Sequence, residues 1–318
     1  MNVQPLFLKP VLKERIWGGR ALQYEFGYEL PSNETGECWA ISAHPNGPSI
    51  IENGPYAGIT LDRLWKEQPE LFGNPKEEVF PLLTKILDAN LDLSVQVHPS
   101  DDYAKVYENG ELGKTECWYI IDCKKDANII IGHNAKTKEE MIRLMNEGKW
   151  DSLLHKRKIK PGDFFFVPSG TIHALCEGTL VLETQQSSDT TYRVYDYDRK
   201  DANGNIRELH LEKAMDVTTV PHQHTQNVPT VEKRENVTIT TFMESEFFSV
   251  YHWDVTGDAT FLIDNKYLLV SVIKGEGSLV NNGEKYSLQK GTHLIIPVGL
   301  RKFNINGNCQ LIVSHRCK

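Results

Sequence analysis

The sequence predicts a mainly β protein of the sandwich or barrel type. Most of its clear signals are short segments rich in β-branched and aromatic residues, separated by Gly, Asn, Asp and Pro. Helical spacing of apolar residues is confined to a few short stretches. A third observation is a Gly–Pro–Gly pattern that occurs once in each half of the chain. These three features together are typical of short strands joined by tight turns.

The expected strands of the first half are six apolar segments. They contain the runs NLDLSVQVH, ECWYIIDC, NIIIG, DFFFVPSG, TLVLETQQ and TYRVYDYD. Residues 267–315 again consist almost entirely of such segments, and the run NNGE at residues 281–284 predicts a tight Asn-Gly hairpin turn.

Four short helices are expected between these strands. The first covers residues 60–72 behind a Thr60 cap, and another begins at Ser100 after a proline. Thr137 and Glu140 form a capping box before a third apolar stretch. A fourth short amphipathic helix is expected over residues 208–217.

Length and composition narrow the class of protein. The chain has 318 residues, which at about 150 residues per domain suggests two domains. Its 40% hydrophobic and 25% charged residues exclude disordered, collagen-like and coiled-coil classes. With 35 Lys and Arg against 43 Asp and Glu the net charge is −8, so we expect no nucleic-acid partner and no membrane surface partner.

The N-terminal segment lacks the apolar core of a signal peptide, and no stretch reaches the ~20 apolar residues of a membrane span. We therefore expect a cytoplasmic protein.

The six cysteines contain no Cys-x-x-Cys pair, which predicts reduced thiols rather than a disulfide framework. Residues 222–237 are polar, contain proline and have no periodicity, so they are predicted to form a linker between two compact units.

The repeated pattern is Gly-x5-Pro-x-Gly-x2-His. It runs from Gly162 to His173, and the same spacing starting at Gly291 ends on Lys302 instead of His. The first glycine turns a hairpin, and Pro-x-Gly makes the corner that directs the next side chain into the barrel. This pattern resembles the second motif of the cupin family, whose fold is a double-stranded jelly roll. The resemblance implies a catalytic jelly-roll domain over residues 1–225 and a second, metal-less one over residues 226–318.

In the run SVQVH, strand alternation places Ser94, Gln96 and His98 on one face. Polar groups buried in a barrel each cost about 1–3 kcal/mol if unpaired, so a hydrogen-bond network or a metal ion should satisfy them. The alternative is an edge strand whose polar side faces solvent, which is the common case for an isolated Gln-x-His.

Two more side chains favour a metal site. His173 occupies the corner position of the cupin motif, and Glu116 begins another apolar strand that crosses the same interior. Two imidazoles, one carboxylate and one amide oxygen suit a divalent ion such as zinc, with metal–ligand distances of about 2.0–2.2 Å. Each residue alone could be structural: Glu116 a strand start, and His173 a hydrogen-bonded core histidine. The prediction therefore depends on the whole set.

Longer motifs extend the resemblance to one branch of the superfamily. The runs QVHP, KTE and PSGTIHA occur in order, together with LKERIWGG, TGECWAIS and TQQSSDTTYRVYDYDR. Over nearly the whole chain this resembles the short bacterial form of type I mannose-6-phosphate isomerase. Membership implies one Zn²⁺ per chain and interconversion of mannose 6-phosphate and fructose 6-phosphate. Position by position, it implies the zinc ligands Gln96, His98, Glu116 and His173.

The same resemblance implies the remaining site residues. Arg193 matches the active-site arginine, Glu183 an acidic residue that moves protons, and Lys114 the lysine two residues before the ligand carboxylate. Substrate and phosphate contacts are implied for Lys85, Ser94, Arg199 and Glu37. One departure is Leu175, which stands where longer relatives carry Tyr, so the sugar-contacting hydroxyl is absent or comes from elsewhere, for example Tyr192 or Tyr195.

Aldose–ketose isomerisation through an enediol(ate) needs a base that serves C1 and C2 and a group that stabilises an oxyanion. Glu183 is the base candidate because it lies in an apolar strand, where burial raises a carboxyl pKa. The alternative is a structural salt bridge between Glu183 and Arg193. Arg193, Arg199 and Lys85 are expected to neutralise the phosphate.

Two rival functions fit parts of the same pattern. A cupin dioxygenase with an iron site is disfavoured because the amide of Gln96 does not belong to the usual facial triad. A regulatory cupin that binds a sugar without transforming it is disfavoured by the set Lys114, Glu183 and Arg193.

The pair His222 and His224 has metal-ligand spacing, but its linker context is not that of a rigid site. A monomer or weak homo-oligomer that acts on a small sugar phosphate is expected.

Overall fold

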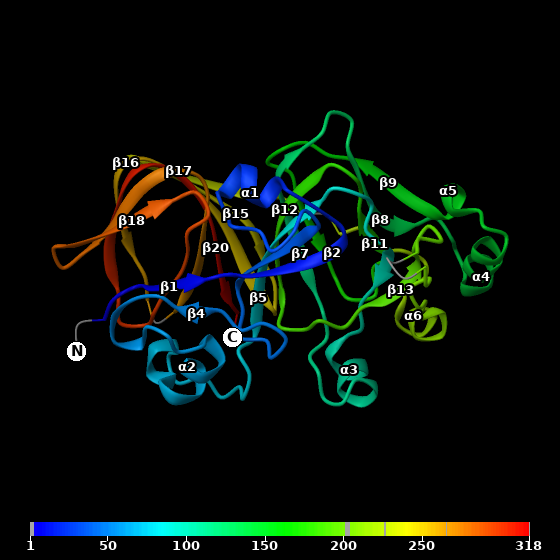
Figure 1. The fold of residues 1–318 in the computed structure, drawn as a ribbon, viewed down its shortest axis with the longest axis horizontal. Helices are drawn as coiled ribbons and strands as arrows, with labels where there is room; N and C mark the ends of the chain where they lie inside the picture. Colours follow the sequence, from blue (N-terminus) through cyan, green and yellow to red (C-terminus); the bar gives the residue numbers. More distant parts are fainter. Residues whose placement is uncertain (1–2, 201–203, 226, 265, 318) are drawn as a thin grey trace.

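A computed structural model describes residues 3–200, 204–225, 227–264 and 266–317. Within these residues the chain forms three antiparallel sheets and a few short helices (Figure 1). The predicted fold class, mainly β with two jelly-roll bodies, is confirmed. No helix in this part of the protein has the length and apolar character needed to cross a membrane.

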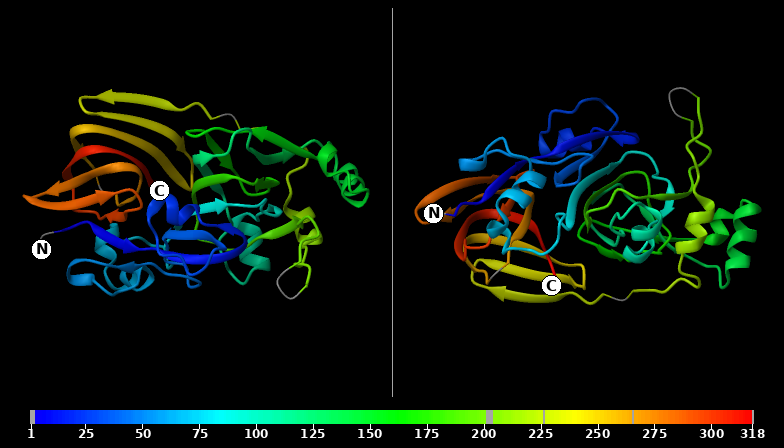
Figure 2. Two further views of the ribbon diagram at one scale, coloured as in Figure 1. Left: turned by 45° about the horizontal axis from the view of Figure 1, so that its top comes forward. Right: turned by 90° about the horizontal axis from the view of Figure 1, so that it is seen from below.

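Two sheets face each other in the first body. The six-stranded sheet has the order β10 (Phe164–Val167), β7 (Glu116–Cys123), β12 (Thr179–Gln186), β5 (Leu82–Ala89), β3 (Thr35–Ile41), β2 (Val11–Gly19). The five-stranded sheet has the order β13 (Tyr192–Tyr195), β6 (Val95–Val97), β11 (His173–Leu175), β8 (Asn128–His133), β9 (Leu154–Lys158). Figure 2 shows these sheets as one side of the elongated molecule.

The core between these sheets supports the polar face described below. Trp118, Leu87 and Val181 of the larger sheet pack in one cluster with Ile129 and Leu175 of the smaller sheet. All five are almost completely inaccessible to solvent, and burial of each contributes about 1.5–3 kcal/mol. The strands that carry the polar side chains are therefore held by a well-packed apolar layer.

The second body is a nine-stranded sheet that curls on itself. Its order is β14 (Thr230–Arg234), β15 (Val237–Glu244), β16 (Phe248–Leu262), β20 (Lys302–Arg316), β17 (Leu268–Asn281), β19 (His293–Ile296), β1 (Leu6–Lys9), β4 (Ile50–Ile51), with β18 (Glu284–Gln289) paired to β17. Two N-terminal strands thus belong to the C-terminal sheet: β1 pairs with β19, placing Leu6 opposite Ile295. The boundary after residue 225 stays a prediction. In addition, strands β1 and β4 from the N-terminal part of the chain belong to the sheet of the second body.

The helices lie at the ends and edges of the sheets. They are α1 (Ala21–Phe26), α2 (Leu61–Glu67), α3 (Asp101–Tyr107), α4 (Lys138–Asn146), α5 (Trp150–Leu153) and α6 (Leu211–Val217), with 3₁₀ turns at Gly54–Tyr56 and Pro69–Phe72. The cap at Thr137 is confirmed, since its hydroxyl accepts a hydrogen bond from the Glu140 amide at 3.2 Å. The expected helices at 60–72, 100 and 208–217 correspond to α2 with its 3₁₀ turn, α3 and α6. The sequence did not predict α1 and α5, which are too short to show a helical period.

The predicted linker is shorter in the structure. Residues 230–234, assigned to it from composition, form β14, which pairs with β15 in register Thr230 to Thr241. All five side chains of β14 are exposed, so this edge strand has no apolar alternation for a sequence pattern to reveal. The Asn-Gly turn is confirmed, because Asn282 and Gly283 both have positive φ, 49° and 84°, as a type I′ turn requires.

Candidate functional site

The four predicted metal ligands meet between the two sheets of the first body. Gln96 lies in β6, directly opposite His173, the first residue of β11. His98 follows β6 by one residue, and Glu116 begins β7 in the facing sheet. His98, Glu116 and His173 are at most 1% exposed. The polar face predicted for the SVQVH strand is thus turned inward.

The donor atoms of these residues converge. Glu116 Oε2 lies 3.5 Å from His98 Nε2, and Glu116 Oε1 lies 3.3 Å from His173 Nε2. One ligand atom from each of the three residues lies within 4.8 Å of the other two. Of the groups formed by described residues, this is the one with the spacing of a metal site. Gln96 adds its amide, whose Nε2 lies 3.3 Å from His173 Nε2.

Backbone carbonyls fix both imidazole rings. His98 donates from Nδ1 to the Thr190 carbonyl at 2.9 Å, and His173 donates from Nδ1 to the Thr171 carbonyl at 2.9 Å. Each Nε2 therefore directs its lone pair toward Glu116, which is how metal-binding histidines are oriented. Burial lowers the pKa of His173 to about 4 and that of His98 well below its usual value, so both rings are neutral at pH 7.

Glu116 itself has an unusual environment. Lys114 Nζ lies 2.9 Å from its Oε2 and 3.1 Å from His98 Nε2. Neither carboxylate oxygen has a well-aligned hydrogen-bond donor among the described residues, although both are buried. Burial opposes the charge of Lys114, but Glu116 and Glu183 together raise its pKa. A buried carboxylate that faces two imidazole lone pairs fits a bound cation.

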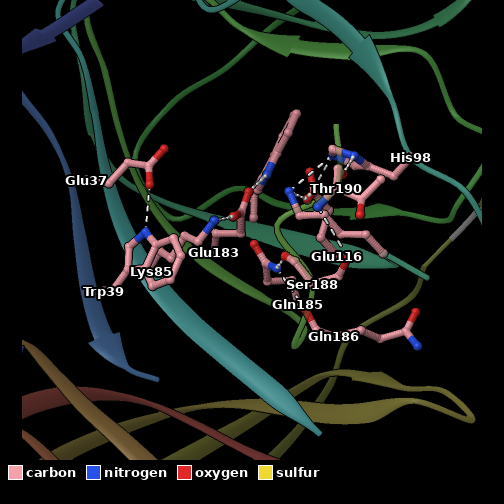
Figure 3. A network of polar contacts seen from close by, with 12 residues as sticks. Glu37, Trp39, Lys85, His98, Glu116, Glu183, Gln185, Gln186, Ser188 and Thr190 are labelled. Atoms are coloured by element: carbon pink, nitrogen blue, oxygen red, sulfur yellow. Dashed lines mark hydrogen bonds and ion pairs between the residues drawn. The ribbon is translucent and has the colours of Figure 1, made fainter. Parts of the chain in front are cut away.

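From Glu116 a row of charged side chains continues through Glu183 and Lys85 to Glu37 (Figure 3). Glu183 accepts a hydrogen bond from Trp118 Nε1 at 3.0 Å and lies 3.8 Å from Lys85 Nζ. Burial, followed by the repulsion of Glu116, raises its pKa. The alternative salt bridge with Arg193 is not formed, because Lys85 occupies that place and Arg193 donates from Nη1 to the Glu208 carbonyl. Glu183 is therefore a buried acid with a raised pKa, as a proton carrier requires.

Glu37 lies at the other end of this row. It accepts two hydrogen bonds from Arg15 at 2.9 and 3.0 Å and one from Trp39 Nε1 at 2.6 Å. Burial disfavours its charge, yet Lys85 and Arg15 hold its pKa at about 2. Lys85 lies between Glu37 and Glu183, with its Nζ 4.9 Å from the centre of the Trp39 ring (Figure 3). Glu37 therefore remains ionised, and its negative charge attracts the Lys85 ammonium.

A cavity of about 400 Å³ opens above these groups. Its lining includes six of the predicted site residues and Gln96 among the predicted ligands. The full lining is Arg15, Trp17, Glu37, Lys85, Leu87, Leu93, Ser94, Gln96, Lys114, Trp118, Leu175, Glu183, Asp189, Thr191, Arg193 and Arg207. Its volume suits a small polar ligand, and both charge signs are present on its walls.

Two guanidinium groups line the cavity. Arg193 has a buried Nε without a hydrogen-bond partner among the described residues, and burial, followed by repulsion from Arg207, lowers its pKa. Arg207 donates to both oxygens of the buried Asp196, at 2.6 and 2.7 Å. The predicted phosphate contact Arg199 does not line the cavity, since its guanidinium bonds Asp196 and the Asp92 carbonyl.

The suggested sources of a sugar-contacting hydroxyl are also placed elsewhere. Tyr192 donates from its hydroxyl to Glu108 at 2.7 Å and packs in the core beneath the smaller sheet. Tyr195 stacks on Trp150 with ring centres 4.3 Å apart. Neither lines the cavity, so the expectation for these two tyrosines is wrong. Leu175 does line it, as an apolar wall.

Several lining residues were not predicted. Arg15 and Trp17 are two residues apart on β2, and side chains at this spacing lie on the same face of a strand. Strand periodicity in the run LKERIWGG could therefore have predicted that both line the cavity. Asp189, Thr191 and Arg207 lie in loops, and no local signal in the sequence distinguishes them from surface residues.

Comparison with protein families gives two matches. Residues 6–120 match the catalytic domain of type I phosphomannose isomerases, and residues 238–316 match the cupin domain of mannose-6-phosphate isomerases. Among curated proteins, the probable mannose-6-phosphate isomerase GmuF of Bacillus subtilis (strain 168) is 58% identical over 98% of this chain and 99% of its own length. Mannose-6-phosphate isomerase ManA of the same organism is 56% identical over 99% of this chain and 100% of its length.

Solved structures give the same result. The crystal structure of mannose 6-phosphate isomerase from Bacillus subtilis, 56% identical, matches with a TM-score of 0.97 over 98% of this chain and 99% of that one. A putative mannosephosphate isomerase from Archaeoglobus fulgidus, 23% identical, matches with a TM-score of 0.79 over both full chains and is evidence for the fold alone.

Proposed function

The chain belongs to the type I mannose-6-phosphate isomerase family, and from this premise we propose that it interconverts mannose 6-phosphate and fructose 6-phosphate with one bound Zn²⁺. The observation that carries the proposal is the convergence of His98, Glu116 and His173 at one end of a charged cavity. A dioxygenase is disfavoured by the family membership.

The residues present fit a zinc ion. Two neutral imidazoles and a carboxylate are a common set of zinc ligands. The amide of Gln96 would be the fourth, because a half-turn about its terminal bond exchanges nitrogen for oxygen beside His173. When bound, the ion would polarise the sugar carbonyl as a Lewis acid.

The proton transfer would be carried by this chain's own groups. In the aldose-to-ketose direction Glu183 takes the proton from C2 of the open-chain sugar and returns it to C1. The hydroxyl proton of O2 moves to O1, so the reaction is balanced without an external oxidant. Lys114 stabilises the negative charge that develops on the enediolate oxygens, and Lys85 lies beside Glu183 as a fixed positive charge.

The phosphate would bind at the guanidinium groups of Arg193 and Arg207. Arg207 is held by Asp196, and Arg193 retains a buried Nε with no partner among the described residues, so donors are available on the cavity wall. Forked guanidinium donors match phosphate oxygens. Arg207, which lines the cavity, therefore replaces Arg199 as the second phosphate-binding guanidinium, and Ser94 adds a hydroxyl to the lining.

The direct test is a coupled assay with mannose 6-phosphate before and after removal of metal. We expect turnover to be lost with a chelator and restored by Zn²⁺, while Glu183→Gln binds substrate but turns it over orders of magnitude more slowly. Metal analysis of the purified protein identifies the ion. Tight binding of mannose 6-phosphate without turnover by the metal-loaded wild type would support the regulatory cupin and contradict the proposal.

A further inference from the structure

A second group of histidines lies outside the catalytic cavity. His155 is in β9, and His222 and His224 are in the segment between α6 and β14, which Figure 2 shows running along the first body. His222 and His224 have ring centres 4.7 Å apart, and His155 and His224 have ring centres 5.4 Å apart. These three rings share a cavity of about 310 Å³ with Arg157.

The spacing of these rings is that of imidazoles around one ion. With a Zn–N distance of about 2.0–2.1 Å and tetrahedral geometry, two bound imidazoles have ring centres roughly 5 Å apart. Among the described residues, the His98 site is the only one whose three ligand atoms already lie within 4.8 Å of one another. The ligand atoms of His155, His222 and His224 are farther apart than this. The rings of the second cluster would therefore close on an ion by rotation about side-chain bonds, which the exposure of His224 and the partial exposure of His155 and His222 permit.

The cluster is also chemically free to bind. No other described residue forms a hydrogen bond or ion pair with the ring nitrogens of His155, His222 or His224. The pKa of His222 is lowered to about 4 by burial and by the neighbouring imidazoles, and no carboxylate contributes. At neutral pH this ring therefore carries a lone pair rather than a proton. Such lone pairs select zinc and similar transition metals over calcium or magnesium.

Its neighbours position the cluster. His222 packs its Nε2 edge against Gly132, where a Cβ would come within 2.4 Å of that nitrogen, so Nδ1 is the nitrogen left for binding. His133 donates from Nε2 to the Thr219 carbonyl at 2.9 Å and so ties the start of the same segment to β8. The ring centres of His133 and His222 are 6.0 Å apart.

We propose that His155, His222 and His224 form a second divalent transition-metal site, separate from the catalytic one, that fastens the segment between the two bodies to β9. The site takes an ion of the zinc class through three imidazoles, with water completing its coordination. It is structural, so the expected effect of the ion is on stability rather than on turnover.

The test is Zn²⁺ titration by calorimetry of tag-free, chelator-treated full-length protein, followed by thermal unfolding with and without Zn²⁺. We expect the wild type to bind two equivalents and H222Q/H224Q to bind one while retaining full isomerase activity. A variant of the catalytic site, H98A/H173A, should also bind one equivalent, and its unfolding temperature should still rise with Zn²⁺, because a ligand of the folded state stabilises it.

Gln223→Ala is the matched control, since this exposed residue lies between the two histidines of the segment. It should bind two equivalents like the wild type. The proposal is overturned if H222Q/H224Q binds as many equivalents as the wild type, or if H98A/H173A binds none. A different outcome is that the wild type binds one equivalent, that H98A/H173A still binds it and that H222Q/H224Q does not. This outcome would contradict the catalytic metal of the proposed function and support the site at His155, His222 and His224.

Discussion

Arg193 is a side chain whose contacts suit ligand binding better than folding. Among the described residues its guanidinium makes one hydrogen bond, from Nη1 to the Glu208 carbonyl at 2.9 Å, and it lines the cavity. We expect Arg193→Ala to reduce kcat/KM for mannose 6-phosphate by orders of magnitude. Stability should fall by only about 1 kcal/mol, the typical value of one hydrogen bond. Steady-state kinetics and thermal unfolding of the same preparation measure both.

Arg199→Ala is the informative comparison for that variant. Arg199 neutralises the buried Asp196 from outside the cavity. Its loss should therefore lower stability more and turnover less than the loss of Arg193. An equal or larger loss of turnover in Arg199→Ala would return Arg199 to the phosphate site.

The pair of Arg15 and Glu37 makes a second prediction at this scale. Because the pKa of Glu37 is held at about 2 by Lys85 and Arg15, its ionised form stabilises the fold above its ordinary pKa of 4.5. That contribution is lost as pH falls from about 4.5 through about 2. Arg15→Met should cost about 1 kcal/mol at pH 7, since Arg15 is partly exposed, and less at pH 3. Urea unfolding at both pH values measures the difference, and an equal cost at both would contradict it.

Single residues also show what sequence reasoning can and cannot reach. His98 and Glu116 were predictable because strand alternation and short motifs fix which face they occupy. The phosphate role expected for Arg199 came from the family resemblance alone. In the structure both Arg199 and Arg207 bond Asp196, but only Arg207 also lines the cavity, so the proposal gives the phosphate contact to Arg207. That choice depends on a loop conformation for which the sequence has no local signal.

The corner before β11 is the element that places His173. Gly170 has φ of 81°, and a Cβ there would lie 2.7 Å from Thr219 Oγ1 and 2.8 Å from the Val217 carbonyl. Gly162 in the same motif has φ of 90° but open space around its Cβ position. We expect Gly162→Ala to cost about 1–2 kcal/mol from backbone strain alone and Gly170→Ala to cost more, because the clash with backbone adds to it.

Chemical denaturation of both variants separates these two contributions. Gly170→Ala should also lower metal affinity, because displacing the corner moves His173 out of register with Gln96. Equal losses of stability in the two variants would mean that the chain relaxes around the added methyl group.

Elements were predicted best where periodicity is strong. The strands β7 and β12 and the capped helix α4 match their sequence patterns. By contrast, β14 escaped prediction because a fully exposed edge strand needs no apolar alternation, and α1 and α5 because one or two turns carry too little periodicity.

At the scale of the whole molecule, the buried His293 and the half-buried His222 contribute to the response to acid. Burial lowers the pKa of His293 to about 3 and, with neighbouring imidazoles, that of His222 to about 4. In the unfolded chain each of these histidines has a pKa of about 6.5. Between this value and the lower pKa of the folded state, the unfolded chain therefore binds more protons than the native state. Stability should therefore fall as pH decreases from about 6.5 to about 4, by up to about 1.4 kcal/mol per pH unit for a fully buried group.

Denaturant unfolding of the metal-free protein from pH 7 to pH 4 measures this slope. His293 contacts Tyr28 and Ser271 at 2.7 and 2.9 Å in the core that joins the two bodies. His293→Gln removes the titrating ring, so its stability should depend less on pH than that of the wild type. An unchanged slope in this variant would exclude His293 as a source.

The pairing of β1 with β19 has a consequence for how the molecule is made. Strand β1 is synthesised first, but its sheet also contains β19 and β20, which are synthesised last. The C-terminal barrel therefore cannot close before translation ends, and until then the edge of β1 needs shielding from other nascent chains. Proteolytic trimming of the first nine residues would expose the backbone hydrogen-bonding groups of β19, and this unpaired strand edge would favour aggregation.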